Sequence, residues 1–300
     1  MSKLQVTENV QIAAPKRSIF EGGIMKETVL SVLGSAFRNA LIVVAGSAML
    51  TTFTSPAMAA NPHFGVRCQD TFQYTWAPTF PFEIACSDFI AVIQGYWPVD
   101  FHFKLHGAQT ALYSGTAAEP CNSCGGVDSV DFFLLGTHGT IANNDPNYTG
   151  FAMWDNNTTA WTSSMRLGDS GKQVKVLATY SCDTLKNGDG RLPNRWGKAF
   201  AGGLKLAVGA HDLLWDSGDD TALQDFAVNL TNNMSIGSSW LNAVYNANNS
   251  NNPTVVNTGA NKTDCWNRQG VTVGQVMSES PLRDSKVGYY CWTNWGSGPE

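Results

Sequence analysis

The chain has 300 residues, of which 43% are hydrophobic and 14% charged, and its formal net charge at pH 7 is −5. An acidic chain without clusters of Lys and Arg is poorly suited to nucleic acid or anionic lipid, so we expect neither as a partner. The length and apolar content suffice for one large α/β domain behind an N-terminal leader.

Residues 26–60 have the features of an export signal: a basic start, an apolar stretch over 40–53, and small residues at the end. The apolar stretch is shorter than the roughly 20 residues that a spanning helix needs, so we expect no stable membrane span. A membrane-anchoring amphipathic segment is the alternative. We interpret 1–59 as an N-terminal extension and secretory signal peptide, and 60–300 as a single domain that is secreted or periplasmic.

Apolar periodicity and turn residues predict strands and helices that alternate along this domain. Such alternation gives βαβ units and therefore an α/β fold with a mostly parallel sheet. A Trp- and Cys-rich tail over about 255–300 closes the chain. In chain order, the pattern predicts a helix over 85–94, strands over 99–106, 130–138 and 174–182, a helix over 195–201, a strand over 204–210, and helices over 220–232 and 238–246.

All seven cysteines lie beyond the predicted signal. In an oxidising compartment six of them can pair, which leaves one over. We expect Cys182 to be the leftover, because it ends a predicted central strand, although an inert buried thiol or a disulfide partner is the alternative reading. Sequence proximity favours the disulfides Cys68–Cys86, Cys121–Cys124 and Cys265–Cys291; for the second pair, a structural disulfide is favoured over a redox or zinc site.

Two apolar strands each deliver one residue of a type used in catalysis. The first, over 130–138, ends at His138, and the second, over 174–182, ends at Cys182. Neighbouring parallel strands end at the same edge of their sheet, which is where open α/β sheets bind ligands. The pattern therefore predicts an imidazole beside a thiol, the pair of groups needed for nucleophilic catalysis.

In this interpretation, His138 lowers the pKa of the Cys182 thiol and later protonates the leaving amine. Gly139 has no side chain, so backbone N–H groups can approach a substrate carbonyl, and its N–H with that of Cys182 could form an oxyanion hole. A histidine with purely structural contacts is the alternative for His138.

The segments Leu-Leu-Gly-Thr-His138-Gly139 and Ala-Thr-Tyr-Ser-Cys182 resemble the paired strand-end motifs of the caspase, legumain and gingipain clan of cysteine peptidases. The segment 196–204, which leads into the next strand, is similar to an uncharacterised bacterial family with caspase-like His-Gly and Cys motifs. The resemblance covers about residues 128–212. It implies a three-layer α/β/α sandwich with a caspase-like sheet, His138 as acid/base, Cys182 as nucleophile, an oxyanion site at Gly139, and neither metal nor cofactor.

Some residues depart from that pattern or lie outside it. Asp183 follows the thiol directly, and its negative charge would raise the thiol pKa. His211 ends the strand over 204–210 and could replace His138 as base or line the cleft. Asn143 and Asn144, in a polar loop after the first motif, are further binding candidates. Calcium binding by Asp183, Asn187 and Asp189 is a weaker alternative, because the loop lacks the EF-hand pattern.

The leading hypothesis is a secreted hydrolase that cleaves a peptide or protein substrate through the Cys182 thiolate, with His138 as proton shuttle. The alternative is a catalytically inactive caspase-like domain that acts as a secreted binding or surface protein. Acyl transfer or amidase chemistry on other substrates would use the same residues.

Overall fold

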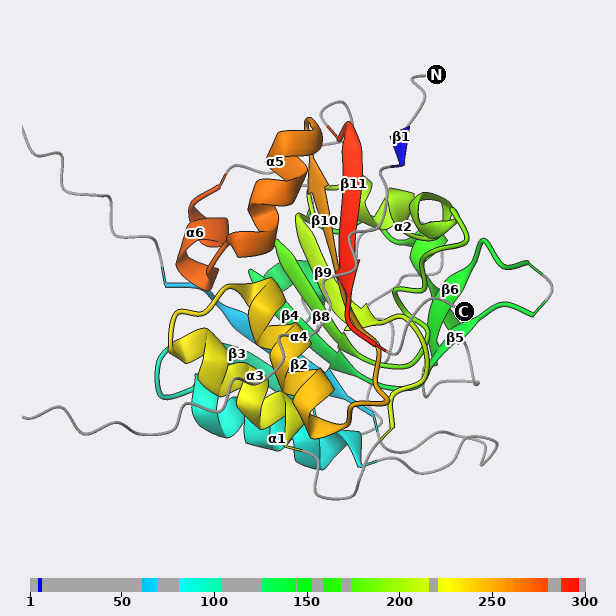
Figure 1. Ribbon diagram of the computed structural model, residues 1–300. Helices are drawn as coiled ribbons and strands as arrows, with labels where there is room; N and C mark the ends of the chain where they lie inside the picture. Colours follow the sequence, from blue (N-terminus) through cyan, green and yellow to red (C-terminus); the bar gives the residue numbers. More distant parts are fainter. Residues whose placement is uncertain are drawn as a thin grey trace, which may run out of the picture. The chain divides into compact units, whose positions relative to one another are not determined.

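A mostly parallel β-sheet forms the centre of the described part of the protein, and helices pack against it (Figure 1). All described residues fall within one compact unit that includes Ala59–Glu300. The computed structural model describes residues 5–6, 61–69, 81–103, 126–143, 145–152, 159–168, 174–215, 221–279 and 287–296.

The strands of the main sheet are, in chain order, β1 (Gln5–Val6), β2 (Phe64–Cys68), β3 (Val99–Phe103), β4 (Phe132–Gly136), β8 (Val176–Tyr180), β9 (Leu206–Ala210), β10 (Pro253–Gly259) and β11 (Tyr289–Asn294). Across the sheet their order is β3-β2-β4-β8-β9-β10-β11-β1. The strands from β3 to β9 in this order are mutually parallel, whereas β10 is antiparallel to both of its neighbours. The prediction of an α/β fold with a mostly parallel sheet is confirmed.

The central strands are apolar throughout because both of their faces are covered. On β4, Phe132 and Leu134 belong to one hydrophobic cluster, whereas Phe133 and Leu135 belong to a second one. All four side chains are almost completely buried. Continuous apolar runs of this kind are typical of parallel sheets with helices on each side, which explains why the sequence pattern located these strands.

The helices are distributed over the two clusters. Residues of α1 (Phe82–Ile93), α3 (Ala222–Thr231) and α4 (Ile236–Ala247) pack into the first cluster with α6 (Val273–Ser278), and residues of α2 (Leu192–Ala201) pack into the second. Figure 1 shows α1, α3 and α4 together on one side of the sheet. Side-chain caps define two of the helix starts: Ser235 accepts from the N–H of Ser238, and Asn261 from that of Asp264. A further short helix, α5 (Lys262–Asn267), begins at the Asn261 cap.

A second, three-stranded antiparallel sheet follows β4 directly and was not predicted. Its strands are short, and their pattern of exposed and buried residues is mixed, so the sequence shows no clear period-2 signal there. It contains β5 (Gly139–Ile141), β6 (Thr149–Ala152) and β7 (Thr159–Trp161), in the order β5-β6-β7.

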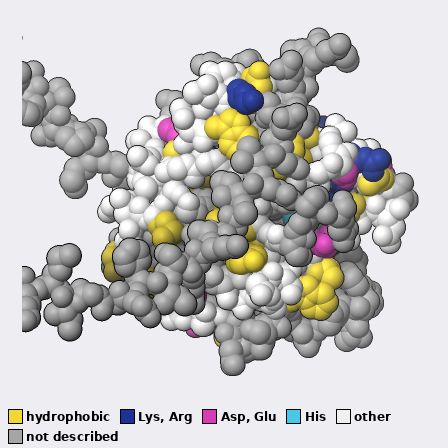
Figure 2. Space-filling model, viewed as in Figure 1, with side chains coloured by type: hydrophobic (Ala, Val, Ile, Leu, Met, Phe, Trp, Pro, Cys, Tyr) yellow, Lys and Arg dark blue, Asp and Glu magenta, His cyan; other side chains and the backbone are white. Residues whose placement is uncertain are grey.

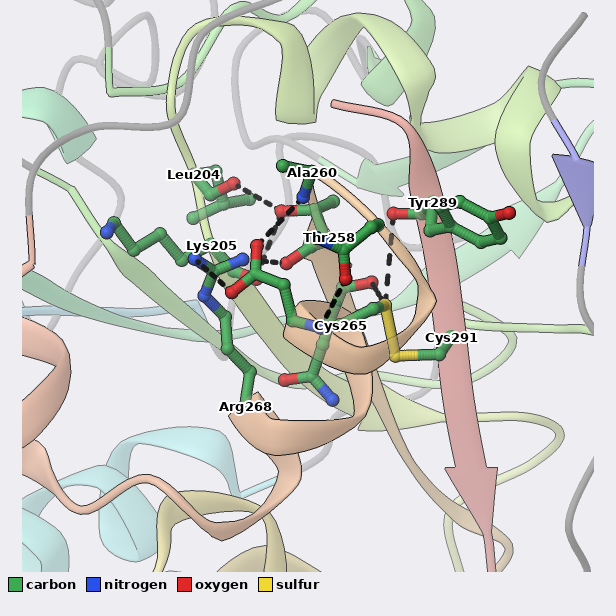
Figure 3. Close-up of a disulfide and its surroundings, with 11 residues drawn as sticks. Leu204, Lys205, Thr258, Ala260, Cys265, Arg268, Tyr289 and Cys291 are labelled. Atoms are coloured by element: carbon green, nitrogen blue, oxygen red, sulfur yellow. Dashed lines mark hydrogen bonds and ion pairs between the residues drawn. A yellow bond between two sulfur atoms is a disulfide. The ribbon is translucent and has the colours of Figure 1, made fainter. Parts of the chain in front are cut away.

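The C-terminal region, expected as a tail, contributes strands to the main sheet. β10 and β11 extend the sheet beyond β9, and α5 and α6 lie between them in the chain. The disulfide Cys265–Cys291 joins α5 to β11 with a Cα–Cα distance of 6.0 Å (Figure 3). The tail is therefore an integral part of the sheet.

The two predicted disulfides within the described residues are both present. Cys68–Cys86 joins the end of β2 to α1 with a Cα–Cα distance of 6.4 Å, and Cys265–Cys291 is the other. Among the described cysteines, Cys182 has a free thiol, as predicted. Cys121 and Cys124 lie outside the described residues, and so does the predicted signal segment 26–60. In the part of the chain that is described, no helix is long and apolar enough to cross a membrane.

Charged side chains are sparse on the visible surface of the described residues. Figure 2 shows Lys and Arg at a few separate places, with hydrophobic side chains in scattered patches between polar surface. This agrees with the composition and gives no sign, on this face, of a continuous basic surface of the kind that binds nucleic acid.

Candidate active site

His138 leaves the sheet two residues after β4 ends and directly before β5 begins. Its backbone carbonyl accepts a hydrogen bond from Ala152 N–H at 2.8 Å, which anchors the residue to β6. The imidazole is partly exposed and stands edge-on to the ring of Phe82, with ring centroids 5.4 Å apart. The ring is thus supported by α1 and still partly open to solvent.

The disulfide Cys68–Cys86 lies under this part of the site. A Cβ at Gly136, two residues before His138, would lie 3.0 Å from the sulfur of Cys86 and 3.1 Å from that of Cys68. Phe82 is one helical turn before Cys86 on α1 and also contacts that position. The disulfide therefore holds together the end of β2, the start of α1 and the end of β4, which together support His138.

Cys182 follows β8 by two residues and opens a tight turn. The turn is tied to the end of β9 by two hydrogen bonds: Asp183 N–H donates to Asp212 O at 3.0 Å, and Leu185 N–H donates to Ala210 O at 2.8 Å. Asp183 has a φ of +55°, a left-handed conformation that is uncommon for residues other than glycine. Such conformations cluster at functional sites, where the surrounding structure holds them in place.

His138 and Cys182 come from equivalent positions of adjacent strands. The register of β4 and β8 pairs Gly136 with Tyr180, so the residues two positions further leave the same edge of the sheet beside each other. The segments are in direct contact, because a Cβ at Gly139 would overlap the carbonyl oxygen of Cys182. Only glycine fits this approach without displacing the Cys182 backbone. The backbones of the three residues that the sequence singled out are therefore adjacent at this edge of the sheet.

The thiol of Cys182 is partly buried and accepts a hydrogen bond from Leu214 N–H at 3.3 Å. Burial raises the pKa of the thiol, and the negative charges of Asp183 and Asp212 raise it further, whereas the Leu214 N–H lowers it. The effect expected of Asp183 is therefore present. In the free protein, these groups favour the protonated thiol.

His211 lies at the same edge, after β9, but its ring is already engaged. Its Nδ1 accepts a hydrogen bond from Asn187 N–H at 3.1 Å, so the proton of the neutral ring is assigned to Nε2. Burial is the main cause that lowers the His211 pKa. A neutral ring with Nδ1 occupied can act as a hydrogen-bond donor through Nε2, but Nδ1 is not available to take a proton from the thiol.

The Asp189 carboxylate is committed to an ion pair with Arg195, whose side chain is 1% exposed. Arg195 Nε also donates to Pro146 O at 2.8 Å, and its Nη1 to Lys186 O at 2.8 Å. Arg195 thus connects the loop that contains Pro146 with the turn that contains Lys186 and Asp189. Among the described residues, no three His, Cys, Asp or Glu side chains are grouped so that they could hold a metal ion. Nothing in this arrangement favours a calcium site at Asp189.

Of the two asparagine candidates, only Asn143 lies within the described residues, and no described contact brings it to the thiol. Asn143 is exposed in the loop between β5 and β6, and Asn144 lies outside the described residues. The rest of that loop is fastened to α2, where Asn194 Nδ2 donates to Asn147 Oδ1 at 3.2 Å. No contact between Asn143 and the Cys182 turn is present among the described hydrogen bonds.

Asp212 and Leu214 are site residues that the sequence analysis did not identify. The signal for Asp212 was its place directly after a predicted buried strand, since β9 ends at the edge where β4 and β8 end. The contact of Leu214 with the sulfur is made by its backbone, so no side-chain pattern could have indicated it.

The fold and site define an α/β protein with a free thiol and an imidazole at the C-terminal edge of a parallel sheet. Residues 87–295 match the family described as Domain of unknown function (DUF6345), and the chain belongs to this family. The matched range includes His138, Cys182 and Asp212. No curated protein matches the chain.

Proposed function

We propose that this chain is an exported, caspase-like cysteine peptidase whose nucleophile is the Cys182 thiolate and whose acid/base is His138. The observation that carries the proposal is the contact of the two strand-end motifs, since the backbone at Gly139 lies against the Cys182 carbonyl. A free thiol in a chain whose other described cysteines are paired supports the same role.

The sheet also supports a three-layer α/β/α sandwich of the caspase type. Its central strands are parallel and buried on both faces, and helices contribute to a hydrophobic cluster on each face. Export is supported by the signal-like segment 26–60 and by the disulfides, which persist in oxidising compartments.

The chemistry follows from the placement of these groups. Cys182 gives its proton to the His138 imidazole, and the thiolate attacks the carbonyl carbon of the peptide bond. The C–N bond then breaks, the amine leaves with the proton from His138, and an acyl-enzyme thioester remains. Water, deprotonated by His138, hydrolyses the thioester and regenerates the thiol.

Gly139 contributes a backbone donor for the oxyanion. The hydrogen bond from Ala152 N–H to His138 O makes Gly139 and Phe151 a non-hydrogen-bonded pair of the β5–β6 ladder. The N–H of Gly139 therefore points away from β6. Removing one oxyanion donor typically lowers kcat by about 10²–10³-fold, so this N–H would be a major part of catalysis.

A second candidate function is a catalytically silent caspase-like binding domain. The observation that favours it is the raised pKa of the Cys182 thiol, which works against thiolate formation in the free protein. The two functions differ in whether the thiol becomes a nucleophile when a substrate is bound.

The test is hydrolysis of a peptide library by the secreted, disulfide-bonded protein, with products identified by mass spectrometry. We expect cleavage that is lost in Cys182→Ala and reduced by about 10²–10⁴-fold in His138→Ala. The matched control is His63→Ala, because His63 is exposed and pairs with Asp100 beside the start of β2. Cleavage that survives Cys182→Ala, or no cleavage of any peptide, would reject the peptidase and leave the binding domain.

A further inference from the structure

The ring of Phe82 contacts both of the strand-end segments that form the site. Phe82 begins α1 and is buried. Its ring is nearly perpendicular to the His138 imidazole, with centroids 5.4 Å apart, and also to the ring of Tyr180, with centroids 6.3 Å apart. Tyr180 is the last residue of β8, two residues before Cys182. One aromatic side chain of α1 therefore touches the segments of both proposed catalytic residues.

The Cys68–Cys86 disulfide fixes the helix that carries Phe82. Cys86 follows Phe82 by one turn of α1, and Cys68 ends β2. Pro81 stands at the N-cap of α1, where it offers no side-chain acceptor, so the helix start has no side-chain cap. Within the described residues, the disulfide is the covalent link that holds the first turns of α1 against the sheet.

The packing around this disulfide is tight on the side that faces the site. Cys68 and Cys86 are almost fully buried. A Cβ at Gly136 would lie 3.0 Å and 3.1 Å from the two sulfurs and 3.3 Å from the Cβ of Phe82. Gln69 N–H also donates to Gly136 O at 2.9 Å, which joins the residue after Cys68 to the end of β4. Two thiols need more space than two bonded sulfurs, so in the reduced chain the close neighbours Gly136 and Phe82 must shift.

We propose that the Cys68–Cys86 disulfide is a redox switch of the site: Phe82 is the positioning residue for the His138 imidazole, and it reaches its position only after the disulfide has formed. The inference rests on the proposed function, because it assigns the regulation of the same catalytic pair. Cytosolic thiols are kept reduced, whereas disulfides form in export compartments. The chain is accordingly inactive until it has been exported and oxidised.

The switch is set by thiol–disulfide exchange. The thiolate of one cysteine attacks a sulfur of a disulfide donor, which is a protein or low-molecular-weight disulfide of the export compartment, and displaces one donor thiol. The second cysteine then attacks the mixed disulfide, forms the Cys68–Cys86 bond and releases the other donor thiol. The two cysteines lose two electrons and two protons, and the donor takes up both as it is reduced to two thiols.

The second described disulfide is a matched control, because it lies towards the opposite edge of the sheet. Cys291 is in register with Asn257, which pairs with Leu206 at the start of β9. Figure 3 shows this disulfide between α5 and β11. The paired cysteines are 18 residues apart in Cys68–Cys86 and 26 residues apart in Cys265–Cys291, so removal of either disulfide has a similar effect on the unfolded chain. A difference in turnover between the two disulfide variants thus reports the position of the disulfide.

The first test measures peptide hydrolysis without the disulfide. In Cys68→Ala/Cys86→Ala, kcat should fall by about 10²-fold, since misplacement by about 1 Å costs this much, whereas KM changes less. Wild-type protein that has never been oxidised should have the same low kcat. Cys265→Ala/Cys291→Ala should keep the kcat of the oxidised wild type, at a temperature at which both variants are folded. Equal kcat in the two disulfide variants would overturn the inference and leave the peptidase intact.

The second test changes the ring and keeps the disulfide. Phe82→Leu removes the aromatic contact with His138 and should lower kcat by about tenfold, less than the loss of the disulfide, because α1 stays in place. The control is Phe89→Leu on the same helix, since Phe89 is equally buried but contacts Phe64 and Phe132. If Phe82→Leu and Phe89→Leu had the same kcat, Phe82 would not be the positioning residue.

The third test needs no hydrolysis. The ring current of Phe82 shifts the imidazole C–H resonances of His138, so Phe82→Leu and Cys68→Ala/Cys86→Ala should both move these resonances in a carbon–proton correlation spectrum. The resonances of His63, which pairs with Asp100, should stay in place, and Cys265→Ala/Cys291→Ala should move neither set. If no peptide is cleaved but the His138 resonances move in this way, the proposed function is lost and the coupling of the disulfide to the imidazole stands. If they are the same in Cys68→Ala/Cys86→Ala as in the wild type, the switch is rejected.

Discussion

The two edges of the main sheet differ in how their charged side chains are paired. At the edge where β8 and β9 begin, Lys205 Nζ lies 2.7 Å from Glu279 Oε2, and Arg268 Nη2 lies 2.9 Å from the same oxygen. At the edge where these strands end, Asp212 forms no ion pair with any described residue and lies beside a free thiol.

We interpret the first edge, where the charges are paired, as structural, and the edge that carries the thiol as functional. Lys205 and Arg268 are almost fully buried, and every described cation of that cluster meets a carboxylate or a backbone carbonyl. Such a network stabilises the arrangement of α5, α6 and the strand starts once it is complete. At the opposite edge, Asp189 is paired with Arg195, but Asp212 has no ion pair with a described residue and contributes to the raised pKa of the Cys182 thiol, which is a pattern expected where a ligand completes a site.

The largest expected effect on stability comes from a substitution that removes the ion pairs at the first edge. Glu279→Gln removes the negative charge that Lys205 and Arg268 share. Arg268 keeps its ion pair with Asp264 at 3.4 Å, but the buried Lys205 loses its carboxylate partner, so we expect a loss of about 3 kcal/mol in the free energy of unfolding. Asp212→Asn is the matched change at the other edge. It should alter that free energy by less than about 0.5 kcal/mol, because no described cation depends on Asp212. Urea unfolding of both variants measures the contrast, and equal losses would contradict it.

The second prediction tests the contact between Gly139 and the Cys182 backbone at the edge that carries the thiol. Gly139→Ala places a Cβ where it overlaps the Cys182 carbonyl oxygen, so the two strand-end segments must separate. We expect a loss of about 1–3 kcal/mol in unfolding free energy, together with a fall in the turnover of any cleaved peptide. The control is Gly274→Ala in α6, where a Cβ meets nothing within 4 Å and where alanine favours the helix. Unfolding free energy and alkylation of Cys182 would be measured for both variants; unchanged values in Gly139→Ala would show that the segments are not in contact.

Much of this geometry could be predicted from the sequence. The strands that end near His138, Cys182 and His211 are continuous apolar runs. The helix α2 between β8 and β9 fits the predicted βαβ alternation, whereas the β5–β7 sheet lies between β4 and β8. The two described disulfides follow from proximity in the sequence. These features depend on local pattern, and local pattern is what a single sequence contains.

The remainder depends on contacts between distant segments. β10 and β11 went unrecognised because the tail is dominated by Trp, Cys and polar residues, and β10 is a strand through its pairing with β9 and β11. The short sheet of β5, β6 and β7 went unrecognised for the same reason: its strands are defined by their pairing with one another and not by a pattern in the sequence. The approach of Asp212 and Leu214 to the sulfur is set by the path of the loop after β9, so no pattern in the sequence could show it.

The smallest expected effect concerns Asp183, the residue that the sequence analysis marked as a departure. Burial is the main cause that raises its pKa in the folded protein, so the fold binds a proton more tightly than the unfolded chain does. The charged form therefore weakens stability above the unfolded pKa of about 3.9, and this penalty disappears below it. Asn tolerates the left-handed backbone at this position and carries no charge.

We therefore expect Asp183→Asn to raise the free energy of unfolding slightly at pH 7, by less than about 1 kcal/mol, and to have no such effect near pH 3. The loss of the weak pairing with Lys186 at 3.9 Å offsets part of the gain, since exposed ion pairs contribute little. Urea unfolding at the two pH values measures the difference, with Asp225→Asn as the exposed control. A variant that is less stable at pH 7 than at pH 3, relative to the wild type, would mean that the fold stabilises the Asp183 charge. In that case the carboxylate already has its partner within the protein, and the contrast between the two edges of the sheet would not hold.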